Sequence, residues 1–213
     1  MGLSFREKLG QSVKKGGLSN SELHHPSRAY ERYFEGYVER AEPVPGKKRA
    51  QSVRTYVDTI FVQEQSDAKR RVFRVLFVVL YLLAVAAFVY SATRSIAANM
   101  TWFVTLPQAV TVFALGWMAL GLYRYCTAPR EMTVRQHRLA VTHLRRACCM
   151  AWIALAVTAA ACLICAVTSP DERGMTLLCA VLNVISCACV LTVFLTERSV
   201  SYTERENPNA RES

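Results

Sequence analysis

The chain has 213 residues, 52% of them hydrophobic, and 26 Lys and Arg against 16 Asp and Glu give it a formal charge of +10. Residues 1–71 are polar and charged, whereas from Val72 onward long apolar stretches alternate with short polar ones. This segregation excludes an ordinary soluble domain, in which polar and apolar residues mix along amphipathic elements.

Residues 1–71 form a small basic N-terminal region, for which we expect an α or α+β structure. It opens with "LSFREKLGQSVKK", where Phe5, Leu9 and Val13 recur every four residues among basic ones. This spacing is typical of a short amphipathic helix on an anionic leaflet, and a frayed terminus is the alternative. A polar linker follows. Four aromatic residues then recur at helical spacing and are candidates for partner binding: Tyr30, Tyr33, Phe34 and Tyr37.

The segment 52–62, "SVRTYVDTIFV", is rich in β-branched residues and predicts a strand. A lone strand is not stable in water, so we expect it to pair with residues 37–44 in a hairpin across Gly46, or with a partner chain. A hairpin conflicts with a helix over 28–44, and the sequence leaves both open.

Ser66 is placed to cap a helix that begins at Asp67 and runs into the first apolar stretch. Four basic residues on this helix are predicted to lie at the level of the lipid headgroups: Lys69, Arg70, Arg71 and Arg74. Each could gain about 1 kcal/mol near an anionic cytoplasmic leaflet, but the favoured interpretation is that these charges only set the orientation of the chain.

Four segments reach the roughly 20 apolar residues that a membrane-spanning helix needs, at about 75–93, 102–125, 147–168 and 175–196. We therefore predict an all-α integral membrane protein, in which residues 72–196 form a bundle of four transmembrane helices. Arg and Lys gather before the first span, between the second and third, and after the fourth. Because such residues stay on the cytoplasmic side, both termini are predicted to be cytoplasmic.

The connector between the second and third spans, residues 127–146, is predicted to be helical, with Thr127 as its cap and Pro129 in its first turn. The tail, residues 197–213, is polar without periodicity and is predicted to be disordered.

Three cysteines raise the question of chemistry. Cys162 and Cys165 form a Cys-x-x-Cys pair, and Cys179 should lie at a similar depth on the next span. A thiol pair is one reading. Packing is the other, because small residues recur every four positions on both spans, where they let helices approach closely. We predict no metal site, since no His or carboxylate accompanies the three thiols.

The spans hold few polar residues and no Asp, Glu, Lys or His. Transport or catalysis within a membrane usually requires ionisable groups there. The candidates for polar contacts between helices are Asn183, Gln108 and Thr158. Asn183 lies near the middle of the fourth span, and its amide needs a partner on the third span or in another subunit.

No catalytic motif or cofactor-binding motif is present in the sequence, so we predict no enzyme and no cofactor. Membrane topology accounts for most of the basic charge, so nucleic acid is not an expected partner. The pattern favours a non-enzymatic scaffold or accessory subunit of a membrane complex in the plasma membrane, bound to another membrane protein or to copies of itself. The alternatives are a component of an oligomeric pore or transporter, and a membrane thiol redox protein.

Overall fold

The computed structural model describes residues 37–42, 51–56, 58–168 and 172–207. The chain divides into two compact units, Met1–Thr55 and Tyr56–Ser213. Strands β1 (Tyr37–Glu42) and β2 (Gln51–Tyr56) are hydrogen-bonded neighbours in a two-stranded sheet, of which all but Tyr56 belongs to the first unit. The hairpin alternative therefore holds for residues 37–42. The predicted amphipathic helix and residues 28–36 lie outside the described residues.

The second unit contains four helices of 26 residues each, α3 (Asp67–Ala92), α5 (Trp102–Thr127), α7 (His143–Thr168) and α8 (Arg173–Arg198). Each is about 39 Å long at 1.5 Å per residue, more than the roughly 30 Å of a hydrocarbon core. All four are long and apolar enough to cross a membrane, as the sequence predicts. Ser66 caps α3 by accepting a hydrogen bond from the backbone N–H of Lys69, also as predicted.

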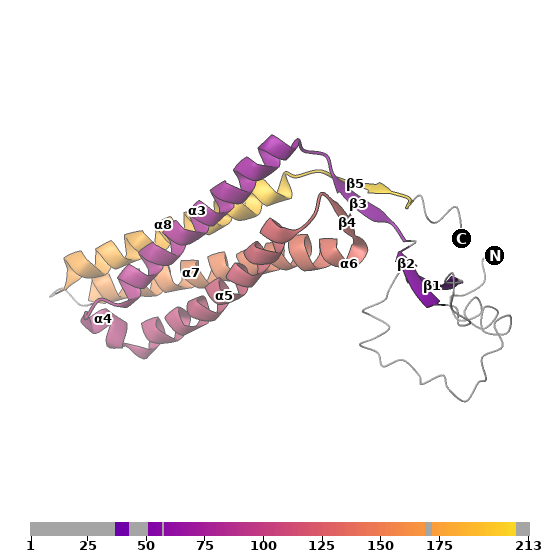
Figure 1. Cartoon of the computed structure of the whole chain (residues 1–213). Helices are drawn as coiled ribbons and strands as arrows, with labels where there is room; N and C mark the ends of the chain where they lie inside the picture. Colours follow the sequence, from indigo (N-terminus) through magenta and orange to yellow (C-terminus); the bar gives the residue numbers. More distant parts are fainter. Residues whose placement is uncertain (1–36, 43–50, 57, 169–171, 208–213) are drawn as a thin grey trace, which may run out of the picture. The chain divides into compact units, whose positions relative to one another are not determined.

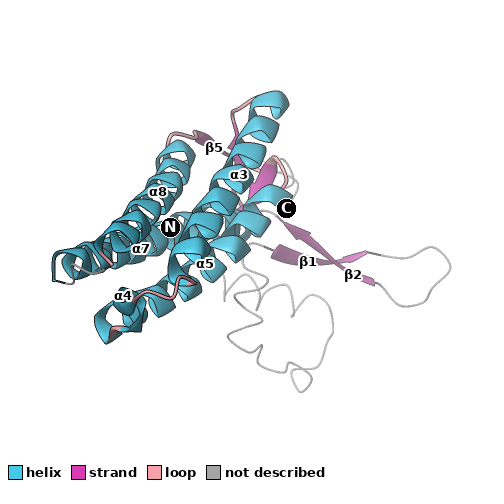
Figure 2. Cartoon of the chain, turned by 90° about the vertical axis from the view of Figure 1, so that its left-hand side faces the viewer, coloured by secondary structure: helices cyan, strands magenta, loops and turns pink. Residues whose placement is uncertain are grey.

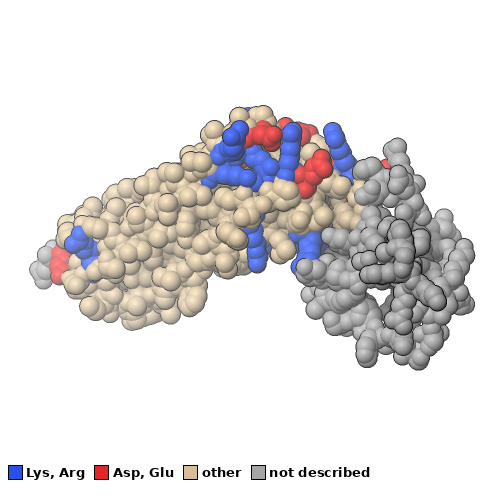
Figure 3. Space-filling view, in the orientation of Figure 1, with Lys and Arg blue, Asp and Glu red and all other residues tan. Residues whose placement is uncertain are grey.

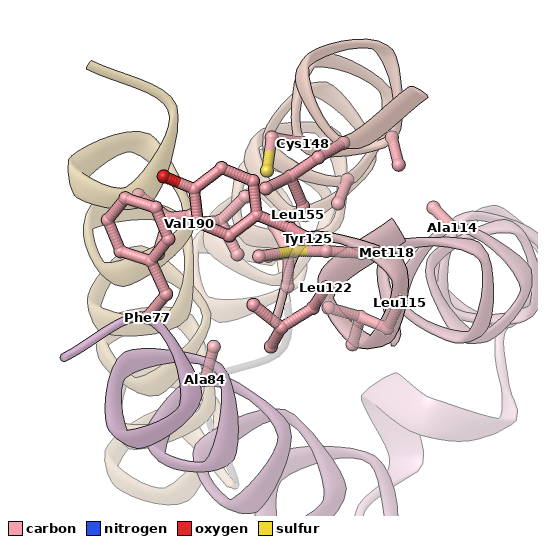
Figure 4. Close-up of a cluster of buried hydrophobic side chains, with 14 of the residues drawn as sticks. Phe77, Ala84, Ala114, Leu115, Met118, Leu122, Tyr125, Cys148, Leu155 and Val190 are labelled. Carbon is pink, nitrogen blue, oxygen red and sulfur yellow. The ribbon is translucent and has the colours of Figure 1, made fainter. Parts of the chain in front are cut away.

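The four helices pack side by side in a bundle (Figures 1 and 2). Helix α7 packs along both α8 and α5, and α3 packs mainly on α8 and touches α5 through fewer residues. Figure 4 shows the core, where Phe77, Met118, Tyr125, Leu155 and Val190 come together from all four helices. On α3 the buried residues recur at helical spacing, whereas Val75, Val79 and Leu82 are exposed. The outer surface is thus apolar, as a lipid-facing surface must be.

A second sheet lies at one end of this bundle, which we call the sheet end (Figure 1). Strand β3 (Ile60–Gln63) is central and pairs antiparallel with β4 (Glu131–Thr133) and β5 (Tyr202–Arg205). The register places Phe61 opposite Met132 on one side and Glu204 on the other. Helices α3 and α7 begin at the sheet end, and α5 and α8 end there.

The predicted strand 52–62 is divided in two, because β2 ends at Tyr56 and β3 begins at Ile60. Its second half does not pair with residues 37–44. It pairs instead with two segments far along the chain, β4 and β5. Their N–H and C=O groups satisfy both edges of β3, which no local hairpin could do.

The prediction of a helical connector over 127–146 is wrong at its start. Helix α5 continues to Thr127, and Ala128 is extended (φ −60°, ψ 139°), as expected for a residue before a proline. Strand β4 follows, and the next helix begins only at Val134. There Thr133 and Gln136 form a capping box for α6 (Val134–His137). A π-helical segment, η1 (Arg138–Thr142), then leads into α7.

The prediction of a disordered tail over 197–213 is wrong for the part of the tail that the structure describes in regular elements. Glu197 and Arg198 complete α8, and Tyr202–Arg205 forms β5. The sequence did not indicate this strand, because all of its side chains except Tyr202 are exposed and the segment is therefore polar. Its order comes from backbone pairing with β3.

Helices α5 and α7 approach closely at Gly121. A Cβ atom on Gly121 would lie 3.1 Å from the Cα atom of Leu144, whereas one on Gly116 would meet nothing within 4 Å. We predict that G121A lowers the thermal unfolding temperature in detergent, at a cost of about 1–3 kcal/mol. The control G116A should leave it unchanged or raise it, since alanine favours helices. Equal effects of the two substitutions would contradict this packing.

Candidate functional site

The sheet end contains a buried carboxylate, that of Glu197 in the last turn of α8. Its side chain is 1% exposed. Arg145, in the first turn of α7, donates from Nε to Oε2 and from Nη2 to Oε1, the latter at 3.3 Å. The hydroxyl of Tyr202, the first residue of β5, donates to the same Oε1 at 3.3 Å. One carboxylate thus joins two helices and the sheet.

Three rings extend this cluster into the strands. His137 of α6 stacks on Phe61 of β3, with centroids 4.3 Å apart and planes 13° apart. The His137 ring also meets the Tyr202 ring edge-on, with the ring centroids 5.0 Å apart. Burial raises the pKa of Tyr202, and the nearby Tyr125 and Glu197 raise it further. The Tyr202 hydroxyl therefore stays protonated and acts as a donor to Glu197.

The basic residues at the start of α3 divide into two pairs. Lys69 and Arg71 are exposed. Arg70 and Arg74 are half-buried, and both donate through Nη2 to the carbonyl of Ala128, from Arg74 at 2.6 Å. Ala128 is the C-cap of α5, where the helix dipole favours positive charge. Lys69 and Arg71 are therefore ordinary surface charges, whereas Arg70 and Arg74 make a specific contact.

Asn183 is fully buried inside the bundle. Its Nδ2 donates to Oγ of Ser91 at 2.9 Å and to the carbonyl of Cys179 at 2.9 Å. Ser91 belongs to α3, so the principal partner lies on the first span rather than on the third or in another subunit. Cys162 of α7 is also near, with Nδ2 and Sγ 4.0 Å apart. In the same interface, the hydroxyl of Ser186 donates to the carbonyl of Ala84 at 2.9 Å.

Gln108 and Thr158 also bind within the chain. Gln108 donates from Nε2 to Oδ1 of Asn99 at 2.9 Å, and Asn99 donates to the carbonyl of Arg94 at 2.8 Å. The hydroxyls of Thr158 and Thr111 lie 3.2 Å apart and join α7 to α5. These contacts join neighbouring helices of the bundle.

The three cysteines considered as members of a thiol pair lie in one buried cluster at the end of the bundle opposite the sheet. Cys162, Cys165 and Cys179 pack there with small residues such as Ala161 and Ala180. All eight cysteines are free. Cys179 contacts Ser91 through its sulfur, at 3.7 Å from the Ser91 carbonyl oxygen. Within the described residues, no group of three or more His, Cys, Asp or Glu side chains is placed to hold a metal ion.

The predicted partner-binding residues Tyr30, Tyr33 and Phe34 lie outside the described residues, and Tyr37 begins β1. Sequence reasoning missed Glu197, Arg145 and Tyr202. A signal for the first was present, because a glutamate in the last turn of a helix opposes the helix dipole and indicates a nearby cation. The sequence could not identify Arg145 as that cation, because it lies 52 positions from Glu197 in the chain.

Comparison of the chain with protein-family models, with curated proteins and with solved structures gave no match. The fold and the cluster at the sheet end therefore carry the functional argument.

We predict that E197Q destabilises the protein by about 2 kcal/mol, because a neutral amide at the buried position 197 removes the counter-charge of Arg145, whose side chain is 36% exposed. The measurement is thermal unfolding in detergent. The control is E204Q, which removes an exposed carboxylate of β5. If the two variants unfold alike, the buried ion pair does not stabilise the sheet end.

A double-mutant cycle should detect the contact between α3 and α8 in the half of the bundle opposite the sheet end. We expect S91A and N183A to couple by about 0.6–1.7 kcal/mol, the range for polar contacts between membrane helices. The pair S91A and T192A should be additive, because Thr192 is exposed on α8 and bonds the carbonyl of Ala188. Additivity in both cycles would refute the Ser91–Asn183 contact.

Proposed function

We propose that the protein is a non-enzymatic, multi-pass membrane protein that acts as a scaffold or accessory subunit of a membrane complex. In this proposal the sheet end and both termini are cytoplasmic, and the membrane is the plasma membrane. Lys and Arg side chains gather toward the sheet end on the face that Figure 3 shows. That distribution supports the orientation, because such residues remain on the cytoplasmic side.

The observation that carries the proposal is that the polar side chains of the spans bind one another. Asn183, Gln108 and Thr158 each have a partner in the same chain and are at most 8% exposed. A pore or transporter needs polar groups along a path for its solute, and a proton-coupled one needs ionisable groups in the membrane. A bundle whose polar side chains bond to one another in this way is better suited to anchor the protein in the membrane than to conduct a solute.

The sheet end supplies the second part of the argument. Strand β3 directly precedes α3 in the chain and is held between β4 and β5, so the segment that follows the N-terminal unit is fixed to the bundle. The residues before this segment form a separate compact unit, Met1–Thr55. We propose that this unit binds a cytoplasmic partner through its aromatic residues. A second membrane protein or a second copy would bind the apolar helix faces.

The two alternatives have less support. In a pore built from several copies, polar side chains would face outward toward the shared path, whereas Asn183 is 0% exposed. A thiol redox protein needs an accessible thiolate, and Cys162, Cys165 and Cys179 are all buried.

The test is affinity purification of the full chain in mild detergent, followed by mass spectrometry of the intact complex. A second protein in fixed ratio is expected. Substitution of Tyr30, Tyr33, Phe34 and Tyr37 by serine should remove it without changing thermal unfolding of the bundle. The control H24S/H25S alters the preceding linker and should retain the partner. A homo-oligomer that conducts ions in liposomes would contradict the scaffold and support the pore.

A further inference from the structure

Two arginines converge on one backbone oxygen at the sheet end. Arg70 and Arg74 are one turn apart on α3, and both donate to the carbonyl of Ala128. They continue the inward face of α3, on which Phe77 is fully buried and the hydroxyl of Tyr81 donates to the carbonyl of Leu115 on α5 at 3.3 Å. The arginine pair therefore lies along the seam between α3 and α5.

The groups that face this pair do not balance its charge. The C-terminus of α5 offers about half a negative charge, against two full positive charges. Among the described residues, the ion pair nearest in sequence joins Asp67 to Arg130 at 3.9 Å, so that carboxylate already has another arginine as its partner. An excess of about 1.5 positive charges remains at the seam.

The hydrogen bonds of the pair are also incomplete. A carbonyl oxygen has two lone pairs, and two guanidinium donors occupy both, whereas each guanidinium carries five N–H groups. The Nε of Arg74 is buried and has no partner. The pair thus retains donor capacity and positive charge beyond its two bonds to the Ala128 carbonyl.

We propose that Arg70 and Arg74 bind the phosphate group of an anionic phospholipid at the seam between α3 and α5. Phosphate oxygens accept charge-assisted, bidentate hydrogen bonds from guanidinium groups, which is the chemistry that the pair lacks. Helices α3 and α5 touch through few residues. Exposed apolar side chains on both, including Val75 and Leu120, offer surface to the acyl chains.

A lipid fits better than a soluble phosphate because of where the pair lies. It occupies the first two turns of a helix long enough to cross a bilayer, and the apolar stretch begins immediately after Arg74. Such positions lie at headgroup level. The site rests on the membrane placement in the proposed function and not on the cytoplasmic partner, so loss of lipid binding and loss of the partner are separate results.

The experiment is native mass spectrometry of the full chain titrated in detergent with phosphatidylglycerol or phosphatidylcholine. The wild type should retain phosphatidylglycerol in preference. R70Q/R74Q should bind it at least about tenfold more weakly, since it loses the charge-assisted bonds. The control K69Q/R71Q removes the same charge from the exposed pair and should stay within about threefold of the wild type.

Two further arms complete the test. R70K/R74K keeps the charge and can still bond Ala128, so it should fold, but it should lose several-fold in affinity because lysine cannot form the bidentate contact. Inorganic phosphate should not displace the lipid. The proposal is overturned if both glutamine pairs weaken binding equally, if the lysine pair binds like the wild type, or if inorganic phosphate competes.

Discussion

The ion pair between Glu197 and Arg145 is the interaction on which the sheet end depends. A carboxylate that is 1% exposed is costly to bury unless its charge is matched and its oxygens accept hydrogen bonds. Arg145 supplies the charge and Tyr202 supplies a further donor. The pair thereby fixes the end of α8 against the start of α7. Through Tyr202 it also fixes β5, which pairs with β3 just ahead of α3.

The opposite half of the bundle is held by weaker contacts of a different kind. Small residues let α7 and α8 approach closely, and neutral polar groups such as Asn183 and Ser91 bond across the interfaces. Among the described residues, charged side chains contribute there only in the turns, where the Glu172 carboxylate accepts from the backbone N–H of Ala97 at 2.6 Å and the Arg94 guanidinium lies over the Tyr90 ring. The ion pair between Glu197 and Arg145 lies at the sheet end, where water and headgroups can solvate it.

Much of this architecture could be predicted from the sequence, because it depends on local signals. Four apolar runs specify four helices, and Ser66 marks the start of the first. The sheet could not be predicted in the same way. Strand β3 pairs with residues about 70 and 140 positions away, and β4 and β5 are only three and four residues long. Short polar strands carry no periodicity that distinguishes them from loops.

The candidate functional residues show the same division between what local sequence signals predict and what depends on distant residues. That Asn183, Gln108 and Thr158 would bond between helices followed from the cost of an unpaired amide or hydroxyl in lipid. The identity of the partners did not follow, since Ser91 and Asn99 are ordinary residues in the sequence. Likewise, four basic residues within six positions indicated a membrane surface. Only the helix phase and the position of Ala128 separate the inward Arg70 and Arg74 from the exposed Lys69 and Arg71.

Hydrogen exchange of the full chain in lipid nanodiscs tests the central claim most directly, namely that the sheet end is one unit held by the buried ion pair. The amides of Ile60–Gln63 and Tyr202–Arg205 are predicted to exchange slowly in the wild type, and E197Q should accelerate both segments together. Fast exchange of both segments in the wild type, or acceleration of β5 alone in E197Q, would contradict the account.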